Sequence, residues 1–331
     1  ARPMTPFTLV LLLAAPAPKT AYLSWSTDVN YSPDGRWLIS YGTVEDREKG
    51  TTRDLGALRL GFTADGKRLF GMTRDQRLVC WDVPGFKERF DVKADHGPDF
   101  HNKAGFYRFG LVVSPDGSFV ATYRLRSRTV KVWHGETGKE ARSLESPSFV
   151  WSMAISPDGK LLAVGDEERN VTVWELATGK KRERFEAIPL RKVRHTSDGW
   201  VNQMCFSPDG KRLAIGVSRL GGDVDTRMPC DLVVRETEKW REVFRVDVGE
   251  TYMHGLAWSP DGKQLATVGH GGIKYARKGG AVKWWSAKDG SAQGAKEMKG
   301  NSYIYGVAYH PGGKRMALFH EEAKEWELPV K

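Results

Sequence analysis

The chain has 331 residues, of which 40% are hydrophobic and 28% are charged, and it carries a net charge of +10. It can bury a core, but no stretch approaches the roughly 18 uninterrupted apolar residues of a membrane-spanning helix. Three cysteines, Cys80, Cys205 and Cys230, are too few for a disulfide framework. The positive charge favours acidic partners, although it is also an ordinary way to limit association.

The first element is the apolar segment FTLVLLLAAPAP at residues 7–18, which has two interpretations. With Arg2 ahead of it, it resembles a secretory signal, and the protein would be exported if residues 4–17 have that role. Cleavage after Ala15 or Ala17 would leave proline as the first residue, which signal processing handles badly. We therefore favour a strand in this segment and expect a cytoplasmic protein.

A phrase of the type Ser-Pro-Asp-Gly recurs seven times along the chain. The copies start at Tyr31, Phe62, Val113, Ile155, Phe206, Trp258 and Tyr309. A period of roughly 40–50 residues is typical of radially arranged or stacked units. We predict a single domain over residues 1–331. Residues 1–24 would form a closing strand and linker, and the repeats would start near residues 25, 56, 105, 149, 200, 252 and 303.

The repeat at residues 150–186 shows how each unit is built. Its segments VWSMAIS, KLLAVG, VTVWEL and KRERFE have strand character, and SPDG, DEERN and ATGK separate them as turns. Four short strands joined by tight turns predict one antiparallel sheet. Such sheets placed around an axis form the blades of a β-propeller.

The third strand of most repeats ends with tryptophan. The matching residues are Trp81, Trp133, Trp174, Trp285 and Trp326, and the fifth repeat has Arg235 instead. An SPDG turn followed by a V-x-V-W strand resembles the WD40-repeat family, over about residues 25–331. Only Trp81-Asp82 is a literal WD pair, and no Gly-His dipeptide precedes a first strand. We therefore expect the family's Asp-His-Ser/Thr-Trp hydrogen-bond network to be largely absent.

The predicted fold is all-β, a seven-bladed β-propeller of four-stranded antiparallel blades. The interval of 31 residues between the first two copies predicts a reduced first blade. The last repeat ends at Lys331 without a fourth strand. We expect FTLVLLL to supply that strand, because this would close the ring and cover an exposed sheet edge.

The two ends of the blades differ in the length of their connections. Antiparallel order places the SPDG and ATGK turns at one end, and the longer connections at the other. The long connections are residues 92–110, 186–199, 217–231 and 269–280. Long loops on a rigid scaffold usually carry binding sites, so we predict that the long-loop face is functional.

Aromatic residues recur where the first strands meet this face, and basic residues lie in its connections. The predicted partner-binding residues are Trp25, Tyr107, Phe109, Phe149, Trp151, Trp200, Tyr252, His254, Tyr303, Tyr305, Arg124, Arg126, Arg191, Arg194 and Lys274. Tryptophan and tyrosine are enriched at binding hot spots. The alternatives are that the aromatic residues only pack against neighbouring blades, and that the basic residues are a solvated rim.

Signals for catalysis and metal binding are weak. The eight histidines lack metal-ligand spacing, GGDVDTRMPCD lacks a complete calcium-loop pattern, and no nucleophile elbow is present. We predict no metal, no cofactor and no enzymatic activity. The expected function is a protein- or peptide-binding scaffold, with an acidic peptide or a member of a multiprotein assembly as partner. Nucleic-acid binding is the second hypothesis, and an enzyme with an axial active site is the third.

Overall fold

A computed structural model describes residues 29–40, 42–97, 109–189, 199–218, 230–249, 252–270, 280–298, 304–319 and 323–327. These residues form 27 strands, which are arranged in seven antiparallel sheets. Within every sheet the strands follow one another in chain order. The described part of the chain holds no helix that could span a membrane.

Each of the first three sheets has four strands. The first contains β1 (Val29–Tyr31), β2 (Trp37–Ser40), β3 (Thr43–Asp46) and β4 (Thr51–Asp54). The second contains β5 (Ala57–Phe62), β6 (Arg68–Thr73), β7 (Arg77–Asp82) and β8 (Lys87–Lys93). The third contains β9 (Phe109–Val113), β10 (Phe119–Arg124), β11 (Thr129–His134) and β12 (Glu140–Glu145).

The next three sheets are also four-stranded, whereas the last has three strands. The fourth contains β13 (Val150–Ile155), β14 (Leu161–Asp166), β15 (Asn170–Glu175) and β16 (Lys181–Glu186). The fifth contains β17 (Trp200–Phe206), β18 (Arg212–Ser218), β19 (Asp231–Glu236) and β20 (Glu242–Asp247). The sixth contains β21 (Tyr252–Trp258), β22 (Gln264–His270), β23 (Gly280–Ser286) and β24 (Ala292–Glu297). The seventh contains β25 (Gly306–Tyr309), β26 (Arg315–Phe319) and β27 (Ala323–Glu327).

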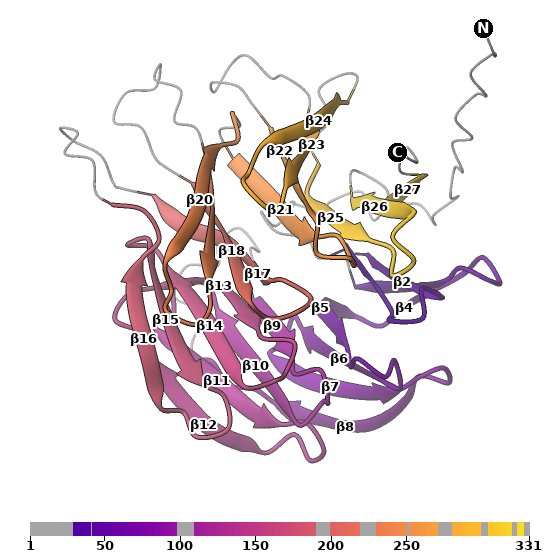
Figure 1. Cartoon of the computed structure of the whole chain (residues 1–331). Coiled ribbons are helices and arrows are strands. Elements are labelled where there is room, and N and C mark those ends of the chain that lie inside the picture. Colours follow the sequence, from indigo (N-terminus) through magenta and orange to yellow (C-terminus); the bar gives the residue numbers. More distant parts are fainter. Residues whose placement is uncertain are drawn as a thin grey trace, which may run out of the picture.

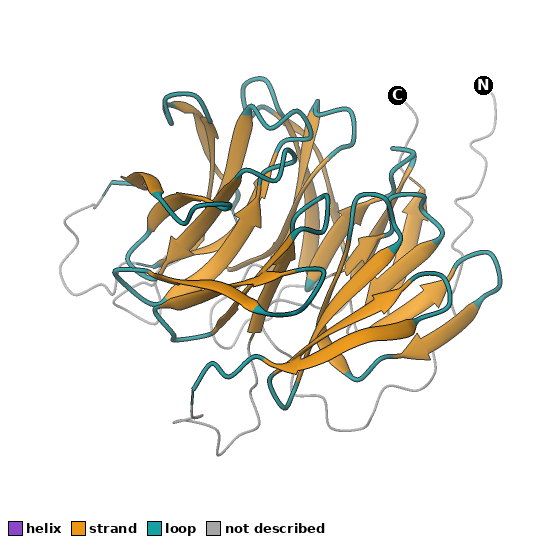
Figure 2. Cartoon of the chain, turned by 90° about the horizontal axis from the view of Figure 1, so that it is seen from below, coloured by secondary structure: helices purple, strands orange, loops and turns teal. Residues whose placement is uncertain are grey.

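The sheets surround a common axis, and the chain passes from one to the next around it (Figures 1 and 2). The first strands of all seven sheets line a central cavity of about 540 Å³. The second to fourth strands of a sheet lie progressively farther from the axis. Accordingly, the outermost strand β24 is exposed along its whole length, whereas β25 is buried throughout. This is the architecture of a β-propeller.

The predicted number of four-stranded blades is wrong. The described residues form six such blades, and the last sheet stops at three strands. The first blade, which we expected to be reduced, has all four strands. Four strands fit into the short interval between the first two copies of the phrase because each strand is only three or four residues long.

The predicted closure by an N-terminal strand has no support. Residues 7–18 lie outside the described residues, and among the described strands β27 pairs only with β26. What the structure does show is side-chain packing between the first and last sheets. Val29, Tyr31 and Leu38 form one buried cluster with Tyr305, Ala308, Ala317 and Phe319.

The repeated phrase has a direct physical explanation in the hydrogen bonds of its turn. In the fifth sheet, Ser207 Oγ donates to Asp209 Oδ1 at 2.6 Å and accepts from the backbone N–H of Arg212 at 2.9 Å. The same Asp209 oxygen accepts from Lys211 N at 3.0 Å. Gly210 adopts a φ of 70°, which favours glycine. The serine, the aspartate and the glycine of the phrase therefore each have a role in this turn.

Replacing Ser207 with alanine should destabilise the protein by about 1–2 kcal/mol, because a buried hydroxyl that makes two good hydrogen bonds is lost. Denaturant unfolding measures this change in free energy. Thr137→Ala, in an exposed turn of the third sheet, is the control and should cost under about 0.5 kcal/mol. Equal stabilities of the two variants would show that the side-chain bonds of the turn are unimportant.

Part of the side-chain network that we expected to be largely absent is present in the third sheet. Trp133 Nε1 donates to Thr122 Oγ1 at 2.8 Å, and the same hydroxyl lies 2.9 Å from His96 Nε2. His96 comes from the connection after β8, so the network joins two neighbouring sheets. A histidine can therefore reach the threonine from the preceding connection without a Gly-His dipeptide.

Acid should weaken the protein through His96. Burial, with smaller contributions from the charges of Lys131 and Arg124, lowers the pKa of His96 to about 4 from 6.5. The unfolded chain therefore binds this proton more readily than the folded protein. The contribution of neutral His96 to the free energy of unfolding is fully present above pH 6.5. It is lost as the pH drops toward 4, which lowers the stability by at most about 3 kcal/mol.

Urea unfolding between pH 7.5 and 4, in the native protein and in a His96→Gln variant, measures this dependence. The variant should show a flatter decline in the free energy of unfolding, because it has no imidazole to protonate. Parallel declines would show that other groups cause the acid sensitivity.

Candidate functional site

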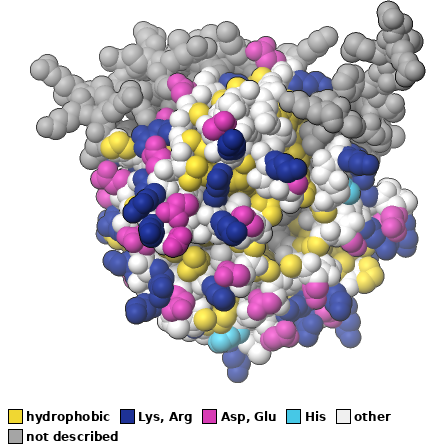
Figure 3. Space-filling view, in the orientation of Figure 1, with side chains coloured by type: hydrophobic (Ala, Val, Ile, Leu, Met, Phe, Trp, Pro, Cys, Tyr) yellow, Lys and Arg dark blue, Asp and Glu magenta, His cyan; other side chains and the backbone are white. Residues whose placement is uncertain are grey.

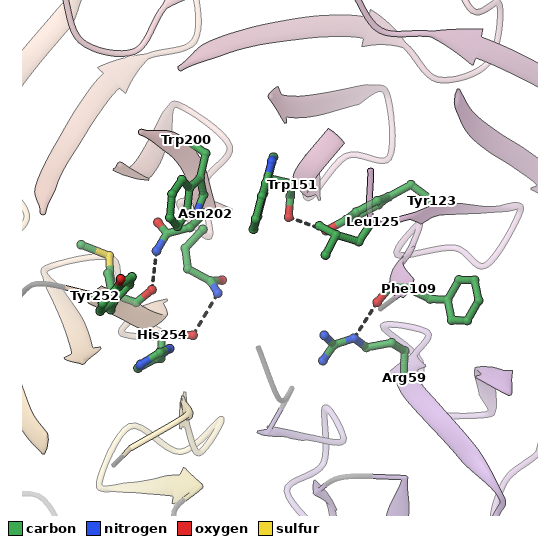
Figure 4. Close-up of a pocket in the computed structure, with 11 residues that line it drawn as sticks. Arg59, Phe109, Tyr123, Leu125, Trp151, Trp200, Asn202, Tyr252 and His254 are labelled. Carbon is green, nitrogen blue, oxygen red and sulfur yellow. Dashed lines mark hydrogen bonds between the residues drawn. The ribbon is translucent and has the colours of Figure 1, made fainter. Parts of the chain in front are cut away.

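A pocket of about 50 Å³ lies where the first strands begin, at the end of the propeller opposite the SPDG turns. Strands β5, β9, β10, β13, β17 and β21 supply its walls, so five neighbouring sheets contribute to it (Figure 4). Gln203 and His254 line both this pocket and the central cavity. The pocket therefore lies at one mouth of the axis, on the predicted long-loop face.

The pocket brings several predicted partner-binding residues together. Trp151, Trp200, Tyr252 and His254 all line it. The indoles of Trp151 and Trp200 stack with their ring centroids 4.8 Å apart. The rings of Tyr252 and His254 stack at 6.3 Å. One side of the pocket is thus an aromatic wall built by three consecutive sheets.

Two other predicted aromatic residues mainly serve packing. Phe109 contributes its backbone to the pocket, but its ring is buried between the second and third sheets and points away (Figure 4). Tyr305 is 8% exposed and packs between the last and first sheets, with its ring centroid 5.6 Å from that of His254. For these residues, packing against a neighbouring blade is what the structure shows.

The remaining predicted residues lie outside the pocket or outside the described residues. Phe149 is half-buried beneath the guanidinium of Arg128, at 5.6 Å. Arg124 donates to the carbonyl of Gly97 at 2.8 Å, and Arg126 is exposed in the turn after β10. The residues outside the described ranges are Trp25, Tyr107, Tyr303, Arg191, Arg194 and Lys274.

β-Bulges explain how the wall is presented to the pocket. Four first strands shift register near their beginning, between Ala57 and Arg59, Val150 and Ser152, Val201 and Gln203, and Met253 and Gly255. The residues skipped by the pairing are Leu58, Trp151, Asn202 and His254. A bulge breaks the two-residue alternation and turns a side chain toward a new direction. The local irregularity therefore presents Trp151, Asn202 and His254 to the pocket.

Hydrogen bonds between neighbouring sheets hold the walls in place. Gln203 Nε2 donates to the carbonyl of His254 at 2.9 Å, and the Asn202 amide donates to the carbonyl of Met253. On the other side, the Tyr123 hydroxyl donates to the carbonyl of Trp151 (Figure 4). These bonds join β17 to β21 and β10 to β13. A partner would therefore meet a pre-organised surface, which lowers the entropic cost of binding.

Arg59 is a pocket residue that the sequence analysis missed. The residue is 7% exposed, and its Nε donates to the carbonyl of Phe109 at 2.7 Å. Figure 4 shows its guanidinium extending into the pocket, toward the aromatic wall on the far side. The residue lies four positions before Thr63, where the other repeats have Asp28, Gly110, Ser152, Gln203, Gly255 and Gly306. The sequence analysis could have found Arg59 because the other repeats mostly have small or uncharged residues at this position.

Groups suited to metal binding or nucleophilic chemistry are not gathered in the described parts of the chain. No cluster of three or more His, Cys, Asp or Glu side chains that could hold a metal ion occurs among the described residues. No disulfide joins the three cysteines, and burial raises the pKa of the Cys80 thiol to about 12. A thiol with so high a pKa stays protonated at neutral pH and is a poor nucleophile.

These features define a β-propeller with an aromatic pocket at one mouth of its axis. Residues 138–175 and 188–223 match the family model described as "WD domain, G-beta repeat". Apoptotic protease-activating factor 1 of Rattus norvegicus is 28% identical over 255 residues, which are 75% of this chain. The predicted resemblance is confirmed, and the chain is a WD40-type propeller.

The relatives are much longer than the segments that match this chain. The match to the Rattus norvegicus protein spans 19% of its length. Small ribosomal subunit protein RACK1y of Oryza sativa subsp. japonica is 27% identical over 139 residues, 42% of this chain and 37% of that protein. WD40 propellers are generally scaffolds for protein interactions, and mostly not enzymes.

Solved structures share the fold over nearly the whole chain. A chain of Kuenenia stuttgartiensis Hydrazine Synthase superposes with a TM-score of 0.69 and 16% identity, covering 96% of this chain and 100% of that one. A chain of the Mitotic Checkpoint Complex gives a TM-score of 0.71 and 16% identity, covering 100% and 98%. At this identity the likeness shows the fold alone.

Proposed function

We propose that the protein is a non-catalytic scaffold that docks a protein or peptide partner on its long-loop face, with the aromatic pocket as the anchor point. The observation that carries this proposal is the gathering of Trp151, Trp200, Tyr252 and His254 around one pocket. Half-buried tryptophan and tyrosine bury much area at low entropic cost, so they are effective binding residues.

The position of the pocket supports the same function. Its side chains come from the rigid first strands, while the predicted long connections start at the same end of the blades. A partner could insert one side chain into the pocket and contact the surrounding loops. Scaffold function is also general among WD40 propellers.

On the face shown in Figure 3, the distribution of charge favours a protein partner over a nucleic-acid backbone. On the face shown in Figure 3, Lys and Arg side chains alternate with Asp and Glu side chains. Among the described residues, several basic side chains are paired with carboxylates, as in the contacts of Arg77 with Asp91 at 2.7 Å and of Arg68 with Glu136 at 2.5 Å. A continuous basic stripe, typical of nucleic-acid binding, is not visible on this face.

Co-purification of the tagged full chain from its native cells, with and without nuclease, tests the proposal. A Trp151→Ala/Tyr252→Ala variant removes half of the aromatic wall. Trp240→Ala is the matched control, because Trp240 is also half-buried but lies in a β19–β20 turn at the opposite end. Thermal unfolding verifies that both variants fold.

The proposal predicts partners that survive nuclease, persist with Trp240→Ala and are lost with the double variant. Partners that vanish on nuclease treatment would favour nucleic-acid binding instead. Partners lost only with Trp240→Ala would place the binding surface at the SPDG end and overturn the proposal.

A further inference from the structure

We infer that the central cavity accepts an extended segment of the docked partner, and that this segment pairs its main chain with the free edges of the first strands. The cavity adjoins the aromatic pocket, because Gln203 and His254 line both. The inference therefore rests on the proposed docking function and specifies how the partner continues beyond the pocket. It depends on the strand edges, the charge of the wall and the shape of the cavity.

The first strands present main-chain groups to the cavity. In every described sheet the first strand lies at one edge and pairs with the second strand only. In the fourth sheet the N–H of Ser156 donates to the carbonyl of Leu161 at 2.9 Å, so Ser156 and Ala154 direct their N–H and C=O groups toward β14. Because these directions alternate along an antiparallel strand, Met153 and Ile155 direct theirs to the free edge.

The same arrangement recurs in the next two sheets. The N–H groups of Ser207 and Ser259 donate to carbonyls of the second strand at 2.9 and 2.8 Å, so the free-edge groups include those of Phe206 and Trp258. Both residues line the cavity, yet their side chains are buried in the cores between sheets. What these residues present to the cavity is therefore their main chain.

One free-edge group already binds an amide, which indicates the chemistry that suits the others. The N–H of Tyr31, at the free edge of β1, donates to the side-chain amide oxygen of Asn30 at 2.9 Å. A peptide carbonyl is an acceptor of the same kind. At the position of Asn30, the other first strands have residues without an amide side chain, namely Gly61, Val112, Ala154, Cys205, Ala257 and Ala308.

The wall of the cavity suits a neutral ligand. Among the described residues that line it, none is Asp, Glu, Lys or Arg. A phosphate or a charged side chain would lose its water there without gaining an opposite charge, which is unfavourable. A nucleic-acid backbone therefore fits poorly, whereas an uncharged peptide segment can bring its own donors and acceptors.

An extended peptide matches the spacing of the free-edge groups. These groups recur at every second residue, as in Met153 and Ile155, and an extended peptide offers its N–H and C=O groups at the same interval. The six-residue strand β13 spans about 20 Å, so a cavity of about 540 Å³ has room for a strand with small side chains. An α-helix bonds its main chain internally and offers nothing to the edges.

A scan of N-methylated peptides provides the test. The full chain is incubated with an array of acetylated and amidated random peptides of about 12 residues. The best peptides are then made again with one main-chain N–H at a time replaced by N–CH₃, which removes a donor and keeps every side chain. Fluorescence anisotropy measures binding to the native protein, Asn30→Trp, Val243→Trp and the Trp151→Ala/Tyr252→Ala variant.

The inference predicts that methylation at alternate residues weakens binding to the native protein by about 10-fold or more, over a stretch of about four to six residues. This stretch should contain no charged residue and no proline, which lacks the N–H group. Asn30→Trp, which places an indole in the cavity, should weaken binding to a similar extent. Val243→Trp, on the outermost strand β20, is the control and should not. The methylation pattern with the native protein decides the result even if Asn30→Trp folds poorly.

Three other outcomes would overturn the inference, and they differ in what they leave standing. Peptides that are lost in Trp151→Ala/Tyr252→Ala but show no alternating effect of methylation would refute it while supporting the proposed docking function. Alternating effects that persist unchanged in a folded Asn30→Trp protein would place the paired edge outside the cavity. An array that yields no peptide dependent on the pocket or on alternate N–H groups would count against both proposals.

Discussion

Phe70→Ala is expected to destabilise the protein by about 3–5 kcal/mol, because it removes a large side chain that is fully buried. Phe70 lies on β6 and packs in one cluster with Phe109, Val120 and Trp133 of the next sheet. The substitution therefore opens a cavity between two neighbouring blades. Denaturant unfolding measures the loss as a fall in the midpoint and in the extrapolated free energy.

Val243→Ala is the control for this prediction. Val243 is 38% exposed on β20, the outermost strand of the fifth sheet, so the cost of the substitution should be below about 0.5 kcal/mol. Similar effects of the two substitutions would show that packing between the second and third sheets is not a main source of stability.

Gly110→Ala should destabilise the protein by about 2–3 kcal/mol and also alter the pocket. A Cβ atom at Gly110 would lie 1.9 Å from Cε1 of Tyr123, so this buried ring would have to move. Movement of the ring would break the bond from the Tyr123 hydroxyl to the Trp151 carbonyl. We expect lower stability in urea unfolding, together with weaker recovery of the partners that co-purify with the tagged chain.

Gly85→Ala tests whether loss of a glycine is harmful in itself. A Cβ atom at Gly85 would meet nothing within 4 Å, so this variant should retain both stability and binding. A Gly110→Ala protein as stable as Gly85→Ala would contradict the close packing of Tyr123 against β9.

The strands of the blades were predictable because each repeat contains all its local signals. In the fourth sheet, the alternating VWSMAIS, the SPDG turn and the VTVWEL strand appear as β13, a tight turn and β15. Strand pairing here is local, so short-range patterns suffice. The number of complete blades was predicted wrongly, because it depended on spacing alone. The short first interval predicted a reduced blade that has four strands, and the last repeat was expected to gain a fourth strand that is not among the described ones.

A substitution in the repeat could not be interpreted from the pattern alone. Arg235 stands where other repeats have tryptophan. Its guanidinium stacks over Phe185 at 4.5 Å and donates to the carbonyls of Glu186 and Trp240 at 2.7 and 2.8 Å. The partners come from the fourth and fifth sheets, so only the three-dimensional structure reveals why arginine is accommodated.

The candidate site was predictable in part, for a similar reason. The aromatic residues at the start of the first strands recur at fixed positions, which led to Trp151, Trp200, Tyr252 and His254. The sequence could not separate them from Phe109 and Tyr305, whose rings pack between sheets. That difference depends on bulges and on neighbouring sheets, which leave no period in the sequence. Arg59 was missed because it occurs in one repeat only.

The most direct test of the docking claim is site-specific photo-crosslinking in native cells. A photoactivatable amino acid replaces Tyr252 in the pocket or, in a second protein, Trp240 at the opposite end. The proposed function predicts that a partner crosslinks through position 252 and not through position 240. Crosslinking through position 240 alone would contradict it and would move the functional surface to the SPDG end.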